Sequence, residues 1–584
     1  MINKFFKKPA HLILFALIFI IGIFSRFYNI QKIPTFIYQD EMGYLISAIS
    51  MNLSGTDITG TWNPLSLSPV TPSIAALDEA TTQFIFPFYK LPINNILAGK
   101  LPFILISLIV PFLIAGISYE FTNSKPIAKW AWLISMFNPW IWQMGRMSVD
   151  PFVSFFFYTA GAYLVLKLNN WKKLWSLPLL FFGFYHYQGH KLVFIFWVLI
   201  FCIYSVAPYI EYKKGLKKLL KSALVSKFKK ILPSLLVFLL SSALFIFYVF
   251  FQLPTHGSSQ RLNSFFTPDS PEIAEIVNED RRMSLDSPLN SILINKYTVW
   301  TSQIFERLTE TYGYKFLFLE GQIDNAAFSV WNHGIFYIID SVLIFFGLVY
   351  LLSKKRYGLL TLLIFGLLVT VIPSLISGSK AYFYRSSLNI PLLIILASIG
   401  TEYLKSILPK YTKYLIYFIY AASIFYFSYI YFVRYPLLSS TRQYFTDRVL
   451  VEYLTRVPLD QEVIVLVPEL EFSVSSYLFY TDYLNHENIS EVQKMFQEKK
   501  YRINNITFTT SCIPSSIEDT EKMIFARWDV KRCDLKTIPP NSLQIKDIKD
   551  NGTIFNIYND KLCSGQKLNS YSHIHKKEQF DFDK

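Results

Sequence analysis

The sequence predicts an α-helical polytopic membrane protein of about eleven transmembrane helices, followed by a small C-terminal α/β domain. The first observation is composition: of 584 residues, 52% are hydrophobic and only 17% are charged, and the mean hydropathy is +0.32. The second is a series of apolar runs long enough to cross a bilayer, which takes roughly 20 residues per helix. The third is a change to polar, strand-rich sequence in the tail. We therefore predict a transmembrane domain at 1–438 and an α/β domain at 439–584.

Each predicted span is an apolar run bounded by polar or basic residues. The runs begin near His11, Ala98, Pro126, Ser148, Leu174, Leu192, Ile231, Gly334, Leu359, Arg385 and Tyr414. The first is not expected to be a cleaved signal peptide, because Arg26-Phe27-Tyr28 follows it rather than a cleavage site of small residues.

Basic residues are concentrated in every second predicted loop, and this alternation orients the chain. The lysine-rich segments are the N-terminus, 172–173, 213–230, 354–356 and 405–413. Cytoplasmic loops carry such an excess of Lys and Arg. We therefore expect the other loops, including the large ones at 26–98 and 252–333, and the tail to be extracytoplasmic, in a protein of the cell (inner) membrane. The net charge of +15 belongs to the inner loops, so no nucleic-acid partner is expected.

The tail alternates strand-like and helix-like segments, which favours a small α/β fold. The strand-like runs are 462–467, 502–508, 522–525 and 553–558, and the helix-like stretches are 472–480 and 490–499. Cys512, Cys533 and Cys563 lie here, whereas Cys202 lies in a predicted span. An extracytoplasmic tail allows one disulfide with one thiol left over, and free buried thiols are the alternative.

The acidic pair Asp40-Glu41 stands just beyond the first predicted span, at the start of an amphipathic stretch. A carboxylate immediately outside a membrane is placed to act as a general base in a reaction of a lipid-linked substrate. The alternative is structural, with Asp40 as the N-cap of a helix from Glu41 to about Met51.

Other ionisable side chains converge on the predicted outer side, at the ends of spans. They are Arg146, Asp150, His186, His190, Lys191 and Arg385. Ionisable groups in such places are candidates for function. For Arg146, Lys191 and Arg385 the alternative is that long cationic side chains merely reach the interface. Asp150 follows Arg146 by four residues, which predicts a spacing of one helical turn.

Several motifs are missing from the sequence. It contains no glycine-rich phosphate loop, no Cys-x-x-Cys, no His-Glu-x-x-His and no nucleophile elbow. Two similar halves with paired interrupted helices, typical of many transporters, are not recognisable either.

Five segments together resemble the C-type polytopic glycosyltransferases of family 39, the superfamily of protein O-mannosyltransferases and aminoarabinose transferases. They are Arg26 … Pro34 … Asp40-Glu41 … Tyr44, then Pro139 … Arg146 … Asp150-Pro151, then Tyr185-His186-Tyr187 … His190-Lys191, then Phe316 … Gln322 … Tyr337, then Tyr384-Arg385 … Pro391 … Gly400. The chain departs from the family pattern in three places: 84–90 replaces a His-Pro-Pro element, Lys100-Leu101-Pro102 replaces Arg-Leu-Pro, and Gln322 replaces an Asp.

The resemblance implies a C-type glycosyltransferase fold and an inverting transfer of a sugar. The donor would be a polyprenyl-phosphate sugar in the membrane lipid, and the acceptor a hydroxyl on a protein, lipid or glycan at the extracytoplasmic face. The implied catalytic residues are Asp40, Glu41 and Asp150, the implied phosphate-binding residues are Arg146, Lys191 and Arg385, and the implied substrate contacts are Arg26, Tyr44, Tyr187 and His190. No cofactor is required. A divalent metal held by Asp40, Glu41 and Asp150 is an alternative, since oxygen ligands suit Mg²⁺ or Mn²⁺, but the resemblance favours metal-independent relatives.

Two other classes of function remain open at this point. A polytopic transporter or flippase of a lipid-linked substrate would use the same charges to line a path. A membrane-anchored binding protein would carry its activity in the tail.

Overall fold

The computed structural model describes residues 9–61, 67–68, 77–207, 221–252, 265–322, 330, 333–376, 383–409, 411–438, 442–514, 521–533, 543–546 and 552–559. The chain divides into two compact units, each assembled from separate stretches of sequence. The first unit comprises Met1–Phe27, Phe103–Gly145 and Val149–Phe427, and the second comprises Tyr28–Pro102, Arg146–Ser148 and Ser428–Lys584. This grouping joins the first predicted outer loop with the tail, whereas the sequence predicted a boundary at residue 438.

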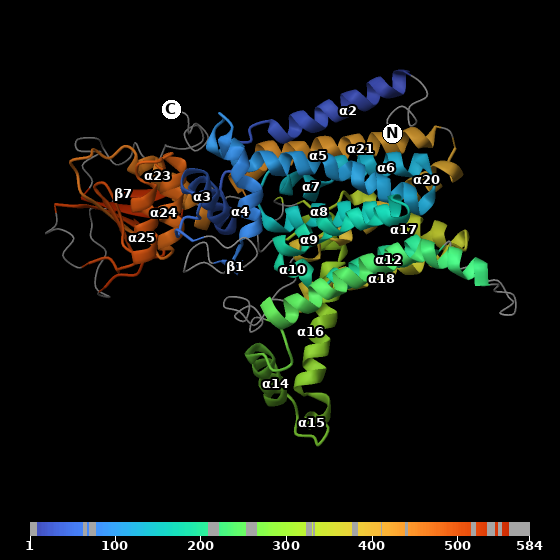
Figure 1. Cartoon of the computed structure of the whole chain (residues 1–584). Coiled ribbons are helices and arrows are strands. Elements are labelled where there is room, and N and C mark those ends of the chain that lie inside the picture. Colours follow the sequence, from blue (N-terminus) through green and yellow to red (C-terminus); the bar gives the residue numbers. More distant parts are fainter. Residues whose placement is uncertain are drawn as a thin grey trace. The chain divides into compact units, whose positions relative to one another are not determined.

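The first unit is a bundle whose helices run side by side (Figure 1). Its α-helices include α2 (Pro9–Phe27), α6 (Lys125–Met136), α7 (Pro139–Met144), α8 (Asp150–Lys167), α9 (Ser176–His186), α10 (Gln188–Lys191), α11 (Phe194–Val206), α12 (Lys221–Phe247), α17 (Ile338–Ser353), α18 (Tyr357–Thr370), α19 (Ile372–Ile376) and α20 (Asn389–Ile407). Between them lie the short 3₁₀ helices η2 (Asn170–Trp175) and η6 (Phe383–Ser386) and the short π-helices η4 (Tyr248–Gln252) and η5 (Lys315–Glu320). Helices α5 (Asn95–Thr122) and α21 (Thr412–Tyr429) contain residues of both units. Every predicted span therefore contains a helix.

Among the described residues, five helical segments are long and apolar enough to cross a membrane. They are Asn95–Thr122, Lys229–Phe251, Tyr357–Ile376, Asn389–Ile407 and Tyr414–Arg434. Leu12–Phe27, Phe194–Val206 and Ile338–Ser353 are shorter apolar helices. Large apolar side chains such as Ile13, Phe250 and Phe425 are more than half exposed, as expected for a surface that faces lipid tails. The fold class of a helical integral membrane protein is confirmed, and the number of crossings stays a prediction.

Two glycines allow α17 and α20 to touch through their backbones. A Cβ added at Gly347 would lie 2.1 Å from the Leu396 carbonyl oxygen, and one at Gly400 would lie 1.8 Å from the Leu343 carbonyl oxygen. Small residues at such crossings let membrane helices pack closely where no hydrophobic drive exists between them. An alanine at either position would have to push the two helices apart.

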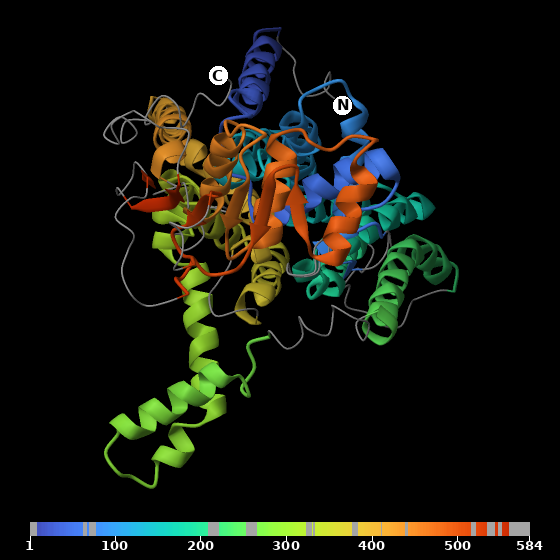
Figure 2. The same ribbon diagram turned by 90° about the vertical axis from the view of Figure 1, so that its left-hand side faces the viewer.

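The predicted loop at 252–333 contains an arm that projects from the bundle (Figures 1 and 2). The arm consists of α14 (Pro271–Met283), α15 (Asn290–Leu293) and α16 (Lys296–Thr311). Its own small core contains Phe266, Ile273, Val277 and Val299. The Arg307 guanidinium attaches the base of α16 to the bundle by donating to the Leu375 carbonyl oxygen at 3.0 Å.

The second unit combines the first outer loop with an α/β fold in the tail. The loop forms α3 (Gln39–Ser54), β1 (Leu67–Ser68), β2 (Leu77–Asp78), α4 (Glu79–Ile85) and η1 (Phe86–Lys90). The tail forms η7 (Ile430–Arg434), α22 (Tyr435–Leu438), α23 (Arg442–Leu454), α24 (Leu470–Tyr480), α25 (Ile489–Glu498) and six strands, β3 (Val463–Leu466), β4 (Tyr501–Ile503), β5 (Ile506–Thr509), β6 (Met523–Arg527), β7 (Leu543–Lys546) and β8 (Thr553–Tyr558).

The sheet of the tail, orange to red in Figure 2, has the order β4-β5-β3-β6-β8-β7. Strand β3 is central and pairs in parallel with β5 and β6, and the outer pairs are antiparallel. The predicted α/β fold is confirmed. The prediction of one strand at 502–508 is wrong, because Asn504 adopts a left-handed conformation (φ 51°) and turns the chain between β4 and β5.

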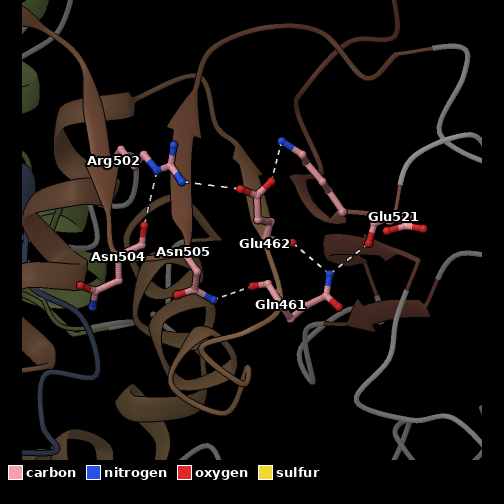
Figure 3. Close-up of polar contacts among 7 residues, drawn as sticks. Gln461, Glu462, Arg502, Asn504, Asn505 and Glu521 are labelled. Atoms are coloured by element: carbon pink, nitrogen blue, oxygen red, sulfur yellow. Dashed lines mark hydrogen bonds and ion pairs between the residues drawn. The ribbon is translucent and has the colours of Figure 1, made fainter.

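A polar network joins the amino ends of the parallel strands (Figure 3). Glu462, just before β3, pairs with Lys522 at 2.6 Å and with Arg502 at 3.6 Å. The Gln461 amide donates to the Glu521 carbonyl oxygen at 3.1 Å, and the Asn505 amide donates to the Gln461 carbonyl oxygen at 2.6 Å. These groups are exposed, so each ion pair is worth at most about 1 kcal/mol. The network aligns strand ends rather than forming a reaction centre.

Among the described residues, the structure shows which cysteines are bonded and which is free. Cys512 and Cys533 form a disulfide, and Cys202 is free and buried. Cys563 lies outside the described residues.

Candidate functional site

The acidic pair lies in the first turn of α3. This helix begins at Gln39, and Tyr38 is its N-cap. The alternative that Asp40 is an N-cap of a helix from Glu41 is therefore wrong, because both acids are already inside the helix. Carboxylates in a first turn are stabilised by the partial positive charge of the helix N-terminus. Asp40 is half-buried, whereas Glu41 and Tyr44 are fully buried.

Glu41 is held by backbone donors on both of its oxygens. Its Oε1 accepts from the Ser148 N–H at 2.8 Å, and its Oε2 accepts from the Tyr38 N–H at 3.4 Å. Burial raises the pKa of Glu41 above its usual value, although the charge of Lys100 and these backbone hydrogen bonds act in the opposite direction. Glu41 thus fixes the start of α3 against the turn at Arg146–Ser148.

Arg146 is fully buried and donates hydrogen bonds to the backbone of the segment that precedes α3. Its Nη2 donates to the carbonyl oxygens of Tyr28 and Ile33, each at 2.8 Å. The rings of Tyr431 and Phe432 lie 5.4 Å from its guanidinium carbon, within cation–π range. A planar guanidinium can serve several acceptors at once, so Arg146 both orders this segment and places positive charge beside it.

The prediction that Arg146 and Asp150 lie one helical turn apart is wrong. Helix α7 ends at Met144 and α8 begins at Asp150, so the residues between them are not helical. Val149 is the extended N-cap of α8, and Pro151 occupies its first turn. Proline favours that position because it lacks an N–H and has a suitable φ. Arg146 and Asp150 are therefore not part of one continuous helix.

Two cations of the second unit were not among the predicted site residues. Lys100, in the second turn of α5, is fully buried within electrostatic reach of Glu41, Arg146 and Arg448. Arg448, on α23 of the tail, is also buried. Lys100 could have been found from the sequence, because it is a charged residue at the start of an apolar run. Arg448 could not, because it stands among many polar residues.

Two buried phenols complete the surroundings of Glu41. Burial raises the pKa of Tyr89 well above its ordinary value, and the negative charges of Glu41 and Asp482 add to this effect. Tyr480 is also within the electrostatic range of Glu41, and burial raises its pKa too. Both side chains are therefore neutral hydroxyls at physiological pH. Neutral hydroxyls beside a carboxylate and several cations suit a polar, hydroxyl-rich or phosphorylated ligand.

The remaining predicted residues belong to the first unit. They are Arg26, Asp150, Tyr187, His190, Lys191 and Arg385. Tyr187 and His190 form an edge-to-face pair at 4.9 Å, and the Tyr187 ring lies 6.1 Å from that of Tyr384, the neighbour of Arg385. Four of the predictions, Asp40, Glu41, Tyr44 and Arg146, thus fall in the second unit and six in the first. A single site that contains all ten stays a prediction.

Local contacts describe the roles of three of these first-unit residues. His190 hydrogen-bonds through Nδ1 to Ser154 Oγ at 2.9 Å and through Nε2 to Ser387 Oγ at 3.1 Å. Burial lowers the pKa of His190 to about 3, so the ring is neutral. The Lys191 ammonium lies 4.8 Å from the Tyr248 ring, and the buried Arg26 guanidinium lies 5.1 Å from the Trp142 ring. Asp150 and Arg385 are half-buried.

The described residues contain no set of side chains arranged as ligands for a metal ion. No group of three or more His, Cys, Asp or Glu side chains there is arranged to hold an ion. The expectation that no metal is required stays a prediction.

Comparison with known proteins gives weak structural likenesses, among them the following two. No family model and no curated protein matches the sequence. The chain is similar to the Archaeoglobus fulgidus oligosaccharyltransferase in its apo form, with a TM-score of 0.43 and 9% identity over 89% of this chain and 70% of that chain. It is similar to ArnT from Cupriavidus metallidurans bound to undecaprenyl phosphate, with a TM-score of 0.43 and 9% identity over 94% of this chain and 98% of that chain. At these scores neither likeness carries an argument about function.

Proposed function

We propose that the protein is an inverting, membrane-embedded glycosyltransferase that moves a sugar from a polyprenyl-phosphate donor to an acceptor hydroxyl. The observation that carries the proposal is the group of buried charges in the second unit: Glu41, which follows Asp40 in the chain, interacts electrostatically with Lys100, and Lys100 interacts with Arg146. Its carboxylates supply a base, and its cations suit a phosphodiester. Buried ionisable groups of this kind cluster at functional sites.

The two carboxylates have different roles in this proposal. Both oxygens of Glu41 accept backbone hydrogen bonds, so Glu41 is a positioning residue. Asp40 is the adjacent, less buried acid, and neighbouring residues on a helix point about 100° apart. Asp40 is therefore the general base. It accepts the proton of the acceptor hydroxyl while the hydroxyl oxygen attacks the anomeric carbon from the face opposite the phosphate.

Departure of the phosphate completes the exchange of bonds. A new bond forms between the acceptor oxygen and the anomeric carbon, and the bond from that carbon to the phosphate oxygen breaks. The lipid leaves as a phosphomonoester with one additional negative charge. Lys100 and Arg146 are the cations that would stabilise this growing charge, because fixed charges aimed at a transition state need no reorganisation. Lys191 and Arg385 remain candidates for the same role, and Asp150 for a second acid.

The proposed setting is the extracytoplasmic face of the cell membrane. The alternation of basic loops supports that orientation, and the exposed apolar helices support insertion. The reaction uses no nucleotide and no metal in this scheme. The acceptor is a hydroxyl on a protein, lipid or glycan.

A transfer assay tests the proposal directly. The purified full chain is placed in liposomes with undecaprenyl-phosphate sugars labelled in the sugar, using hexosyl and pentosyl donors and a membrane extract as the source of acceptors. We expect label to move from lipid to acceptor, and Lys100→Gln to slow this transfer far more than Lys90→Gln, an exposed control in η1. Movement of intact donor between leaflets without transfer would identify a transporter and refute the proposal.

A further inference from the structure

We propose that the arm formed by α14, α15 and α16 is an anchor on the membrane surface, whose tip inserts apolar side chains among the lipid headgroups beside the bundle. The tip is the segment 283–293, which contains α15 and leads from α14 towards α16. This inference goes beyond the proposed transfer reaction and does not depend on it. The sequence predicted only a large outer loop for this part of the chain.

The root of the arm is attached at the end of a candidate membrane span, Tyr357–Ile376. The Phe266 N–H donates to the carbonyl oxygen of Ile376 at 2.8 Å. The Arg307 guanidinium donates to the carbonyl oxygen of Leu375 at 3.0 Å, and its central carbon lies 3.6 Å from the Phe266 ring. Both attachments use the last two residues of the span, so the arm leaves the bundle at the level where the span meets the membrane boundary.

The direction of the arm keeps it at that level. Helix α16 runs across the helices of the bundle rather than parallel to them (Figures 1 and 2). Because the bundle helices cross the bilayer, a helix perpendicular to them follows the plane of the membrane. Elements that lie in this plane bury their apolar side chains about 5–10 Å deep, at the boundary between headgroups and acyl chains.

The tip carries large apolar side chains that the fold leaves open. Leu285 is 92% exposed, and the others that are more than half exposed are Met283, Leu289, Ile292 and Leu293. The small core of the arm uses different residues. A contiguous group of exposed apolar side chains marks a surface that binds a protein or a membrane. Here the bilayer that must surround the bundle is already present at the level of the root, which favours lipid.

Charge is separated from the apolar tip along the arm. Segment 283–293 contains one charged residue, Asp286. Glu272, Glu275 and Glu279 are exposed on α14 at positions i, i+3 and i+7, which lie on one face of a helix. An apolar tip beside an acidic face is the amphipathic division expected of an element that rests at an interface. The binding energy comes from the apolar side chains, so anionic lipid is not required.

A second copy of the chain is the competing occupant of the tip. It would cover the same side chains with protein instead of lipid. The two occupants differ in what lies within contact distance of the tip, so a measurement of lipid contact distinguishes them.

The test places fluorescent reporters on the full chain in phosphatidylcholine liposomes, with Cys563 replaced by serine to lower the labelling background. Leu285→Cys and Leu289→Cys carry an environment-sensitive dye at the tip. Glu275→Cys, on the acidic face of α14, is the matched control; all three positions are exposed, so the dye displaces no buried contact. Lipids brominated near the top of the acyl chain quench a dye that they touch. We expect blue-shifted emission and loss of about half of it or more at both tip positions, and neither effect at the control.

Three results would overturn the inference. The first is tip emission as in water without quenching by brominated lipid. The second is a blue shift without lipid quenching, together with efficient cross-linking of Leu285→Cys between two copies, which would identify the tip as a protein interface. The third is equal quenching at the tip and at Glu275→Cys, because an anchor of this design keeps its acidic face in water.

Discussion

The Glu41 carboxylate accepts a 2.8 Å hydrogen bond from the backbone N–H of Ser148, which lies 107 residues further along the chain. A hydrogen bond to an ionised acceptor is stronger than a neutral one, and leaving a buried N–H unpaired costs free energy. The bond therefore joins the start of α3 to the turn that contains Arg146. In the proposed reaction the two adjacent acids have different roles: Glu41 holds the geometry and Asp40 is the general base.

The first prediction separates these tasks by substitution. Asp40→Asn should lower the rate of sugar transfer about 10²- to 10⁴-fold, the usual loss for a general base, with donor affinity and unfolding temperature close to wild type. Glu41→Gln should retain more activity per folded molecule but unfold at a lower temperature. The cause is that both Glu41 oxygens accept backbone hydrogen bonds in the wild type, whereas glutamine has one oxygen. Its amide NH₂ would therefore face the other backbone N–H, which would lose its acceptor.

Transfer rate, donor binding and thermal unfolding of both variants check this prediction. Unchanged turnover in Asp40→Asn would contradict its role as the base. A larger loss of chemical rate in a fully folded Glu41→Gln protein would exchange the two roles.

The second prediction concerns Arg146. Arg146→Ala removes the donors to the Tyr28 and Ile33 carbonyl oxygens and leaves these acceptors with a desolvation cost of about 1–3 kcal/mol each. We expect a lower unfolding temperature together with weaker donor binding and a lower rate. Arg146→Lys keeps the charge but cannot reproduce the fork, so its defects should be intermediate. Near-normal donor binding and transfer in a folded Arg146→Ala protein would move the phosphate contact to Lys191 and Arg385.

The sequence could predict part of this site because its members stand at abrupt changes of composition. Asp40-Glu41 and Arg146 interrupt apolar runs, so their positions alone attract attention. The partner of Glu41 is a backbone N–H, which leaves no trace in residue type. Arg448 lies in a polar segment where one more arginine gives no contrast. Contacts between residues hundreds of positions apart depend on tertiary packing, and the periodicity of hydrophobic residues does not predict them.

The helical elements were predictable for a similar physical reason. A bilayer demands long apolar runs, and each such run contains a helix. A short turn between the third and fourth spans, at Arg146–Asp150, was predicted too, and the chain is non-helical from Gly145 to Val149; only the one-turn helical spacing of Arg146 and Asp150 was wrong. The extended backbone of Val149 and the proline that follows Asp150 begin a new helix there, so Arg146 and Asp150 do not share one helix.

The third prediction is a pH dependence of stability that arises in the tail. Asp447 is buried beside Arg527, 3.6 Å away, and accepts a hydrogen bond from Ser473. Burial raises the pKa of Asp447 to about 7, although Arg527 and Ser473 act in the opposite direction. Between its ordinary pKa near 4 and this value, the folded protein holds a proton that the unfolded chain has released. Stability from this group is therefore fully present below about pH 4 and is lost as the pH rises through 7.

Thermal unfolding at about pH 5 and about pH 8 checks the sign of this effect, since the contribution of Asp447 to stability falls across that interval. Asp447→Asn has no titrating group there and should show a smaller difference. Asp460→Asn, on the exposed surface, controls for the loss of a negative charge. An identical pH difference in wild type and Asp447→Asn would contradict the assignment.

The fourth prediction concerns the disulfide between Cys512 and Cys533, which are 21 residues apart. A cross-link that closes a loop of this size stabilises a fold by about 3 kcal/mol, mainly by restricting the unfolded chain. Replacement of both cysteines by serine should therefore lower the unfolding temperature, and a reducing agent should affect only the wild type. Alkylation of both thiols in unreduced protein purified from the membrane would show that the bond does not form in the cell.

The last prediction is that the tail lies outside the cytoplasm and the loop between α17 and α18 lies inside, as the basic loops indicate. Asp57, a natural choice for labelling in the first loop, is unsuitable because it is buried and accepts from the N–H groups of Thr59 and Thr61. Leu459 in the tail is 77% exposed, and Lys354 is exposed in the basic loop, so each can be replaced by cysteine without loss of a buried contact.

Native cysteines leave a low background for this experiment. Cys202 is buried and Cys512 is bonded to Cys533, so only Cys563 needs replacement by serine. A membrane-impermeant maleimide should label Leu459→Cys in intact cells and Lys354→Cys only after permeabilisation. Leu459 and Asp40 belong to the same compact unit, so labelling from outside places the proposed base on the outer side as well. The opposite pattern would put the acidic pair in the cytoplasm, where the proposed reaction on an extracytoplasmic acceptor cannot occur.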